Sequence, residues 1–236
     1  MVTEREFIRS HSSFWKDTLP YCEIYVRYLN ASFAGTYAKE LVSSVAPNRR
    51  ALVNELAFEV FAASLATGDV GAIAGAPERI TELYTTTLAT MQRFAAFGLP
   101  QGPLTFHEQS EAIKLARPME TFLRRYDKRP LVKPKFPGCG MIDAVEGDLL
   151  IDRTLVEVKA GDRAYRGVDL RQLLTYCALN YGTDVHDIEM IGLLNPRAGT
   201  FFEEKLSVVC VRLSGEPVEA VLDRIRSFVS SALASP

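Results

Sequence analysis

The sequence predicts an α/β protein in which a mixed central sheet flanked by helices follows an all-helical N-terminal region. Apolar residues recur at helical spacing through most of residues 1–100. After residue 100, short apolar runs typical of strands alternate with helical patterns. The Pro- and Gly-rich segment GLPQGP separates the two parts. We therefore expect a helical region at residues 1–100, which binds a partner or substrate, and a second domain at residues 101–236.

The composition is that of an ordinary globular protein and names no partner. The 236 residues are 47% hydrophobic and 24% charged, with a net charge of −2. Any nucleic-acid surface must therefore be a local cluster. The four cysteines are scattered without metal-ligand spacing, and no apolar run reaches the roughly 20 residues of a membrane span. We expect a cytoplasmic protein with reduced thiols and no membrane contact.

Helices are predicted first in the N-terminal part. Thr3 and Glu6 have the spacing of a capping box at the start of the first helix. Two longer helical patterns cover residues 48–68 and 77–98. Each of them ends near a glycine, as helices often do.

The second part alternates helices with strands. Helices are expected at residues 106–126, kinked or restarted at Pro118, and at 168–182. A last helix, with apolar residues three and four apart, is expected from Pro217 to Ala234. Five apolar runs are expected to form strands, at residues 140–146, 148–152, 154–160, 189–196 and 206–213.

The hairpin sequence GDLLIDRTLVEVKAG places charged residues inside apolar strands. If the chain turns at residues 152–153, Asp148 faces Glu157 directly across the hairpin. Lys159 then shares the face of Glu157, because side chains alternate along a strand. Two carboxylates this close repel each other unless a cation lies between them. The alternative is a solvated, salt-bridged surface, although the apolar neighbours favour a mostly buried sheet.

Two carboxylates and an ammonium group on one patch suit a hard divalent cation such as Mg²⁺ or Mn²⁺. Such a metal polarises a phosphate oxygen and lowers the pKa of a bound water. Lys159 could orient that water or stabilise the charge that builds up on the phosphate. The patch therefore predicts metal-dependent phosphoryl chemistry.

The arrangement resembles the PD-(D/E)XK nuclease superfamily, in which an aspartate on one strand and Glu-x-Lys on the next bind metal and cut phosphodiester bonds. In this sequence those residues are Asp148, Glu157 and Lys159, although glycine stands where the family motif has proline before the aspartate. Gln172 and Tyr176 have the Q-x-x-x-Y spacing of RecB-like nucleases, whose glutamine and tyrosine lie beside the active site and help to hold DNA. The resemblance implies that all five residues are catalytic.

The resemblance also implies a restriction-endonuclease-like fold with an αβββαβ core, over roughly residues 104 to 215. It implies a metal held by Asp148, Glu157, Val158 and a residue of the preceding helix, for which we choose Glu111. That helix and its surroundings offer further candidates, which are His107, Glu108, Glu120 and the rival aspartate Asp143. Gln172 and Tyr176 lie off the apolar stripe of their own helix, which leaves them available to a cleft.

DNA contacts are expected from two basic segments. Residues 124–135 hold six basic residues against one acid, a pattern that suits either phosphate contact or a solvated charge run. Arg163 and Arg166 follow Lys159 closely and could neutralise a phosphate, while Tyr165 could stack on a base. The DNA-binding residues predicted in the first segment are Arg124, Arg125 and Lys128. Backbone contacts of this kind imply salt-sensitive, mostly sequence-independent binding.

These patterns predict a Mg²⁺- or Mn²⁺-dependent deoxyribonuclease, cutting at ends or internally, in phage defence or in DNA repair and recombination. One alternative is a catalytically silent nuclease-fold subunit that binds DNA or assembles a larger complex. Another is an interaction adaptor that binds no metal. A Ser-His-Asp hydrolase is disfavoured because the chain has three histidines and no G-x-S-x-G motif. A protein partner and a homo-oligomer both stay open.

Overall fold

The computed structural model describes residues 2–94, 102–183 and 185–231. A mixed six-stranded sheet forms its centre, in the order β1-β8-β7-β6-β5-β2, and β3 and β4 form a separate pair. The α/β class and the mixed sheet are thus confirmed. The strands are β1 (Gly35–Thr36), β2 (Leu131–Val132), β3 (Lys135–Phe136), β4 (Val145–Glu146), β5 (Leu149–Ile151), β6 (Thr154–Val158), β7 (Met190–Asn195) and β8 (Thr200–Lys205).

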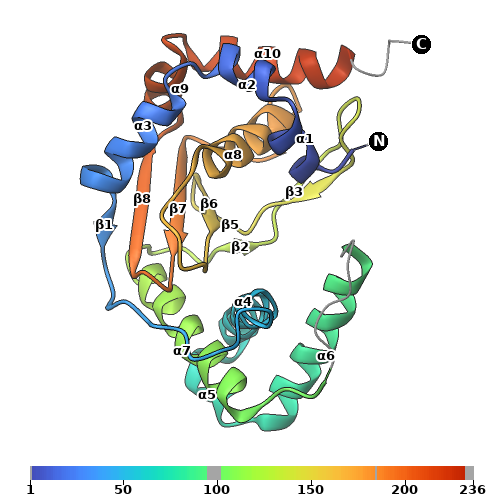
Figure 1. Ribbon diagram of the computed structural model, residues 1–236, viewed down its shortest axis with the longest axis vertical. Helices are drawn as coiled ribbons and strands as arrows, with labels where there is room; N and C mark the ends of the chain where they lie inside the picture. The colour runs from blue at the N-terminus through green and yellow to red at the C-terminus, as the bar shows by residue number, and fades with distance from the viewer. Residues whose placement is uncertain (1, 95–101, 184, 232–236) are drawn as a thin grey trace.

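Helices cover both faces of the sheet (Figure 1). One hydrophobic cluster joins α1–α3 and α8–α10 to the face of Leu155, and a second joins α4–α7 to the face of Val156. The helices are α1 (Glu4–Ser10), α2 (Ser12–Thr18), α3 (Cys22–Tyr28), the π-helix η1 (Leu29–Phe33), α4 (Arg50–Thr67), α5 (Val70–Ala74), α6 (Pro77–Phe94), α7 (Phe106–Leu123), α8 (Gly167–Asn180), α9 (Leu206–Ser214) and α10 (Val218–Ser231). Because neighbouring strand residues face opposite sides, β6 is apolar on both faces.

Local signals in the sequence place several helix ends correctly. The Thr3 hydroxyl accepts from the Glu6 backbone N–H at 3.2 Å, and the Glu6 carboxylate accepts from the Thr3 N–H at 2.8 Å. This is the predicted capping box, and it satisfies two backbone donors that a helix start leaves unpaired. Helix α4 ends before Gly68, whose φ of 107° suits a residue without Cβ.

The hairpin register is as predicted. Leu149 pairs with Val156, and Ile151 pairs with Thr154, which leaves Asp152 and its neighbour as the turn. Asp152 has a φ of 55°, in the left-handed region that aspartate tolerates better than most residues. On its other side, strand β6 pairs in parallel with β7. Helix α8 is the crossover connection between these two strands.

The strand expected at residues 206–213 is wrong, because these residues form helix α9. Its buried side chains are Leu206, Val209, Cys210 and Leu213, which follow the spacing of one helix face. The β-branched residues of this run favour a strand locally, but packing against the sheet selects the helix. The last strand in chain order, β8, directly precedes α9. It lies in a segment of mixed polarity where no strand was expected.

Helix α7 runs through Pro118 without restarting, which leaves a kink as the remaining form of the expected break, and Leu115 and Met119 are buried on either side of the proline. One further expectation needs correction. The N-terminal region is not all helical, since β1 pairs with β8 at the edge of the sheet. Its helices α1–α3 and α4–α6 also cover opposite faces of that sheet. The boundary expected at residues 98–103 lies mostly outside the described residues.

All four cysteines are free thiols, and three of them are buried. Burial raises the pKa of the Cys22 thiol to about 11 and that of Cys210 to about 12, so both stay protonated at neutral pH. Within the described residues, no helix combines the length and the hydrophobicity that crossing a bilayer requires.

Candidate active site

The hairpin of β5 and β6 brings Asp148 against the end of β6. The Asp148 Oδ2 atom accepts a hydrogen bond from the Val158 backbone N–H at 2.7 Å. Because the N–H and C=O of one strand residue point the same way, the Val158 carbonyl also faces the side of Asp148. The structure therefore places Asp148 beside Val158, two of the residues that the resemblance assigned to the metal.

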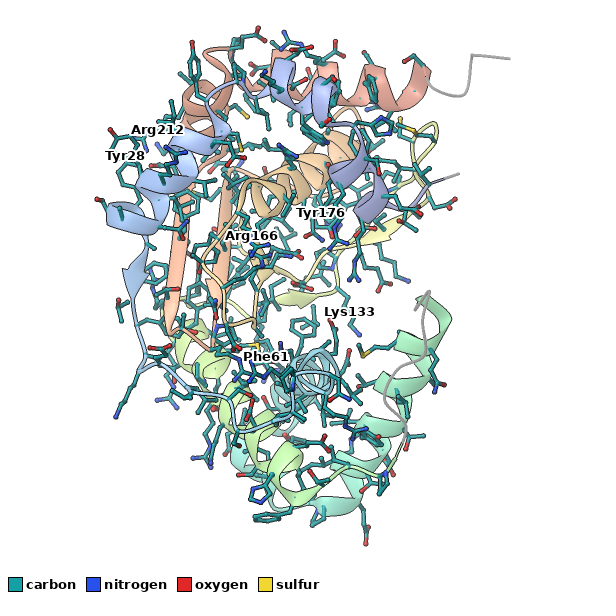
Figure 2. All side chains as sticks on the ribbon, viewed as in Figure 1. Tyr28, Phe61, Lys133, Arg166, Tyr176 and Arg212 are labelled. Atoms are coloured by element: carbon teal, nitrogen blue, oxygen red, sulfur yellow. The ribbon has the colours of Figure 1, made fainter. Side chains whose placement is uncertain are left out.

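A chain of hydrogen bonds runs from β6 to α8. The Lys159 ammonium donates to Glu157 Oε1 at 2.8 Å and to Gln172 Oε1 at 2.7 Å. The Gln172 side-chain N–H₂ then donates to the Tyr176 hydroxyl at 2.7 Å. Tyr176, labelled in Figure 2, stacks on Phe136 with ring centroids 5.3 Å apart. Residues of two elements are thus held in one polar network.

This network is buried, so it is not the solvated surface that the sequence left open. Glu157 is 5% exposed, and the Lys159 side chain is 19% exposed. Gln172 and Tyr176 are 6% and 2% exposed, although their helical positions suggested side chains available to a cleft. That expectation is wrong because α8 is enclosed on nearly every side, so its polar residues bond to one another.

Burial and charge shift the pKa values of the site. Burial and the neighbouring Glu157 raise the pKa of Asp148 well above its ordinary range, which Lys159 and the Val158 N–H only partly offset. Burial by itself lowers the pKa of Lys159. The opposite effect of the nearby carboxylates of Glu157 and Asp148 is larger, so the net shift of this pKa is upward. The Lys159 ammonium therefore stays protonated at neutral pH, while the Asp148 carboxylate resists ionisation until a cation compensates its charge.

The structure adds Glu55 of α4, which sequence analysis missed. The Glu55 side chain is exposed at the surface, and its pKa is raised because neighbouring atoms displace part of its water and because Glu59 and Glu157 lie nearby, against the opposite effect of Arg5. Glu55 in turn raises the pKa of Asp148. The carboxylate thus lies within electrostatic range of the predicted pair, about 100 residues away in sequence. A single acid in an apolar helix carries no local signal that could have identified it.

The oxygen donors of the site fit a magnesium-like ion in part. Asp148, Glu157 and the Val158 carbonyl offer three oxygens, and Mg²⁺ commonly uses one or two carboxylates while it keeps several waters. Throughout the described ranges, however, no three side chains of His, Cys, Asp or Glu are grouped as metal ligands. The chain therefore supplies a carboxylate pair rather than a complete cage.

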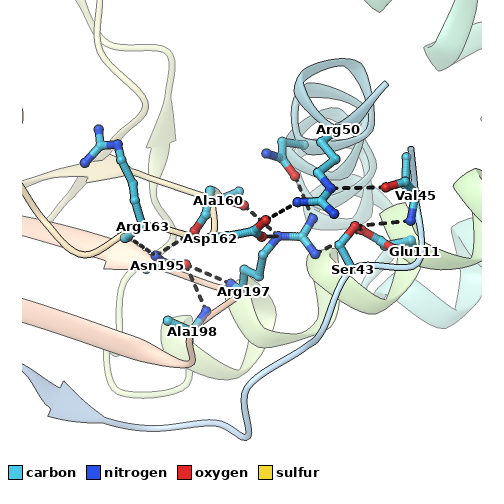
Figure 3. Close-up of polar contacts among 12 residues, drawn as sticks. Ser43, Val45, Arg50, Glu111, Ala160, Asp162, Arg163, Asn195, Arg197 and Ala198 are labelled. Carbon is cyan, nitrogen blue, oxygen red and sulfur yellow. Dashed lines mark hydrogen bonds and ion pairs between the residues drawn. The ribbon is translucent and has the colours of Figure 1, made fainter. Parts of the chain in front are cut away.

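Glu111 is not part of this pair, contrary to the metal ligand expected from α7. Its carboxylate accepts from the Ser43 hydroxyl at 2.6 Å and the Ser44 backbone N–H at 2.9 Å, and pairs with Arg197 Nη1 at 2.9 Å (Figure 3). Burial raises the pKa of Glu111, but these three partners outweigh it and bring the pKa below its ordinary range. The residue is a buried ion-pair partner that anchors the loop before α4.

The other candidates near α7 are placed elsewhere too. Glu108 accepts from Arg49 Nη2 at 2.9 Å and caps its own helix. His107 and Asp143 are exposed, and Glu120 is half-buried. Among the described residues, none of these side chains has a hydrogen bond or ion pair to Asp148 or Glu157.

The arginines after Lys159 differ in their availability. Arg163 donates two hydrogen bonds of 2.6 Å to Asp169, which also accepts from the Arg166 backbone N–H at 2.8 Å. The Arg166 side chain is exposed. Tyr165 is buried, and its hydroxyl lies within hydrogen-bond distance of the Leu193 and Thr200 carbonyls, so its ring is held by the protein rather than exposed for a base.

The basic segment after α7 is partly neutralised by the protein itself. Arg125 pairs with Glu203 at 3.0 Å and lies over the Phe201 ring at 3.7 Å. Lys128 pairs with Asp152, whereas Arg124 is exposed. A phosphate would therefore compete with carboxylates for two of the three predicted contacts.

Comparison with models of protein families finds no match for this chain, and comparison with curated proteins finds none either.

Proposed function

We propose that this protein is a divalent-metal-dependent DNA nuclease of the RecB-like PD-(D/E)XK type. The observation that carries the proposal is the hydrogen-bond chain in which Lys159 contacts both Glu157 and Gln172, beside Asp148. A chance glutamine on an outer helix face would not meet the lysine of a strand motif. Among the strands of the six-stranded sheet, with the separate pair β3 and β4 left out, the order α7, β2, β5, β6, α8, β7 is consistent with the αβββαβ order of that fold, which supports the proposal further.

The residues present could hold the ion that this chemistry needs. Asp148, Glu157 and the Val158 carbonyl would bind Mg²⁺ or Mn²⁺, which when bound acts as a Lewis acid on the scissile phosphate. The raised pKa of Asp148 means that the folded chain brings two carboxylates together at an electrostatic cost. Such a pair is preorganised for a cation, and part of the binding energy comes from relief of this repulsion.

Side chains of the protein supply the positive charge at the phosphate and hold it in a fixed orientation. Lys159 keeps its proton at neutral pH and places a positive charge where negative charge builds up on the phosphate. Gln172 fixes the direction of the Lys159 ammonium, and Tyr176 fixes Gln172 through its hydroxyl. Arg166 has an exposed side chain, whereas Arg163 is paired with Asp169, so of these two predicted arginines Arg166 is the more available to an adjacent phosphate.

A catalytically silent DNA-binding or assembly subunit is the second candidate. It is favoured by the carboxylate pair that lacks a third protein ligand in the part of the chain that the structure describes. The ion pair of Lys159 with Glu157 also occupies one oxygen that a metal would use. The setting that we propose for either function is cytoplasmic, in phage defence or in DNA repair and recombination.

Incubation of the purified protein with single- and double-stranded DNA and Mg²⁺ or Mn²⁺ tests the proposal. We expect cleavage that chelation of the metal abolishes and that Glu157→Gln removes. The matched control is Glu146→Gln, which changes an exposed acid of the neighbouring strand β4. DNA binding without cleavage in the wild type, unchanged by Glu157→Gln, would instead support the silent subunit.

A further inference from the structure

A pocket of about 450 Å³ opens at the ends of β6 and β7, where the chain leaves Lys159. Residues 161–165, which follow Lys159 on the way to α8, form one wall. Asn195 at the end of β7 and residues 197–198 just after it form another wall. The first wall thus begins two residues after Lys159, which directly follows β6. Its volume falls within the range of roughly 300–1,000 Å³ that is usual for small-molecule sites.

Buried polar residues hold this wall in place (Figure 3). Arg197, which is 3% exposed, donates from Nε to the Ala160 carbonyl at 3.0 Å. Asn195, also buried, donates to the Gly161 carbonyl at 3.1 Å and accepts from the Arg197 backbone N–H at 3.0 Å. The Glu111–Arg197 ion pair anchors this network to α7. The pocket is therefore formed before any ligand arrives, which lowers the entropy cost of binding.

The lining combines apolar walls with a rim of both charges. Leu41, Val42 and Ala164 contribute apolar surface, and Arg50 and Asp162 lie at the rim. Arg50 and Arg197 both pair with Asp162, and Arg163 pairs with Asp169, so the arginine charge is largely compensated. This balance disfavours a bare phosphate or carboxylate. It suits a nucleoside, which has flat apolar faces and a polar edge.

We propose that this pocket receives one unpaired nucleoside of a DNA strand whose neighbouring phosphate lies at Asp148, Glu157 and Lys159. The inference rests on the proposed nuclease function and adds its substrate class. A base inside the pocket is unstacked and cannot pair with a second strand, so duplex DNA must first open locally. Single strands and frayed ends are therefore the preferred substrates over blunt, fully paired duplexes.

The first experiment is an abasic scan of a single-stranded oligonucleotide with Mg²⁺ and the full-length protein. We expect a single abasic position to slow cleavage about ten-fold at the phosphate one fixed step away, because the pocket loses its base there. Ala164→Trp, which places a large side chain on an exposed part of the wall, should slow cleavage of the intact strand and remove this abasic effect. The control Ala72→Trp, on the exposed surface of α5, should leave both unchanged.

A second experiment measures binding without cleavage. Calorimetry should show deoxynucleoside monophosphates binding about ten-fold more tightly than deoxyribose 5-phosphate, with the difference lost in the Ala164→Trp variant. If that variant fails to fold, Val42→Trp at a rim position that is 82% exposed takes its place. Equal affinity for the two ligands would overturn the proposal of a nucleoside pocket, and so would wild-type cleavage that abasic positions do not slow. Neither result would contradict the proposed nuclease function. A wild type that cuts no DNA yet shows the nucleotide preference overturns the nuclease function, and the pocket stands as a nucleotide site.

Discussion

The ammonium group of Lys159 lies 2.7 Å from the side-chain oxygen of Gln172, and this contact joins strand β6 to helix α8. The same ammonium lies 2.8 Å from Glu157 on its own strand. The Lys159 ammonium thus links the Glu-x-Lys motif to the Q-x-x-x-Y motif of α8.

Replacement of Lys159 should remove activity. We expect Lys159→Ala to lower the cleavage rate about 10²–10³-fold, as loss of one charge-stabilising group typically does. The substitution also leaves Glu157 and Asp148 without their nearest cation, so Mn²⁺ binding should be retained while phosphate turnover is lost. Cleavage assays combined with calorimetric Mn²⁺ titration check this, and a variant that keeps wild-type turnover would remove Lys159 from the site.

Replacement of Gln172 should lower both stability and activity. Gln172→Ala leaves the buried Tyr176 hydroxyl and one Lys159 N–H without their partner, which costs roughly 1–3 kcal/mol. For a protein of this size that corresponds to a decrease in Tm of about 2–4 °C for each kcal/mol. Differential scanning calorimetry measures this decrease in Tm. The control Gln109→Ala changes a half-buried glutamine outside the network, and an equal effect there would contradict a specific role.

The raised pKa of Asp148 makes stability depend on pH. The folded state holds the Asp148 proton more tightly than the unfolded state, so stability decreases as pH rises from the ordinary value of 3.8 through the raised pKa. At neutral pH, Asp148→Asn should therefore raise Tm in the absence of metal, and Mg²⁺ should stabilise only the wild type. Melting curves across this pH range test the sign. The control Asp143→Asn, at an exposed position, should follow the wild type.

Glu55 should tune the affinity for metal from across the site. Because Glu55 raises the pKa of Asp148, removal of its charge makes the local field less negative. We expect Glu55→Gln to weaken Mn²⁺ binding several-fold and to lower the pKa of Asp148. Calorimetry at two ionic strengths measures the first effect. The exposed Glu78 at the start of α6 provides the control variant Glu78→Gln, and equal weakening in both variants would make the effect non-specific.

Glu111 should matter for stability and not for metal binding. Glu111→Ala removes the buried one of the two carboxylates that pair with Arg197 and leaves it only the more exposed Asp162; breaking a buried ion pair typically costs about 3–5 kcal/mol. Urea denaturation measures this loss, and Mn²⁺ titration below the transition should show unchanged affinity. A variant with normal stability and weakened Mn²⁺ binding would instead restore Glu111 as a ligand.

The parts of the fold that could be predicted depend on short-range rules. Alternation and a two-residue turn suffice to set the register of β5 against β6, because both act between neighbours in sequence. The capping box at Thr3 is equally local. The run at residues 206–213 shows the limit of such rules. Its branched apolar residues suit a strand, and only the surfaces it packs against select α9.

The sequence by itself determined that Asp148, Glu157 and Lys159 share one face of a hairpin, and that Gln172 and Tyr176 lie a turn apart on the next helix. Tertiary structure decided that this helix is enclosed, so that its glutamine bonds to the lysine rather than facing a cleft. It also brought Glu55 towards the carboxylates and gave Glu111 to Arg197. The physical reason is range, because strand and helix periodicity act over a few residues, whereas burial and charge pairing depend on which distant surfaces meet.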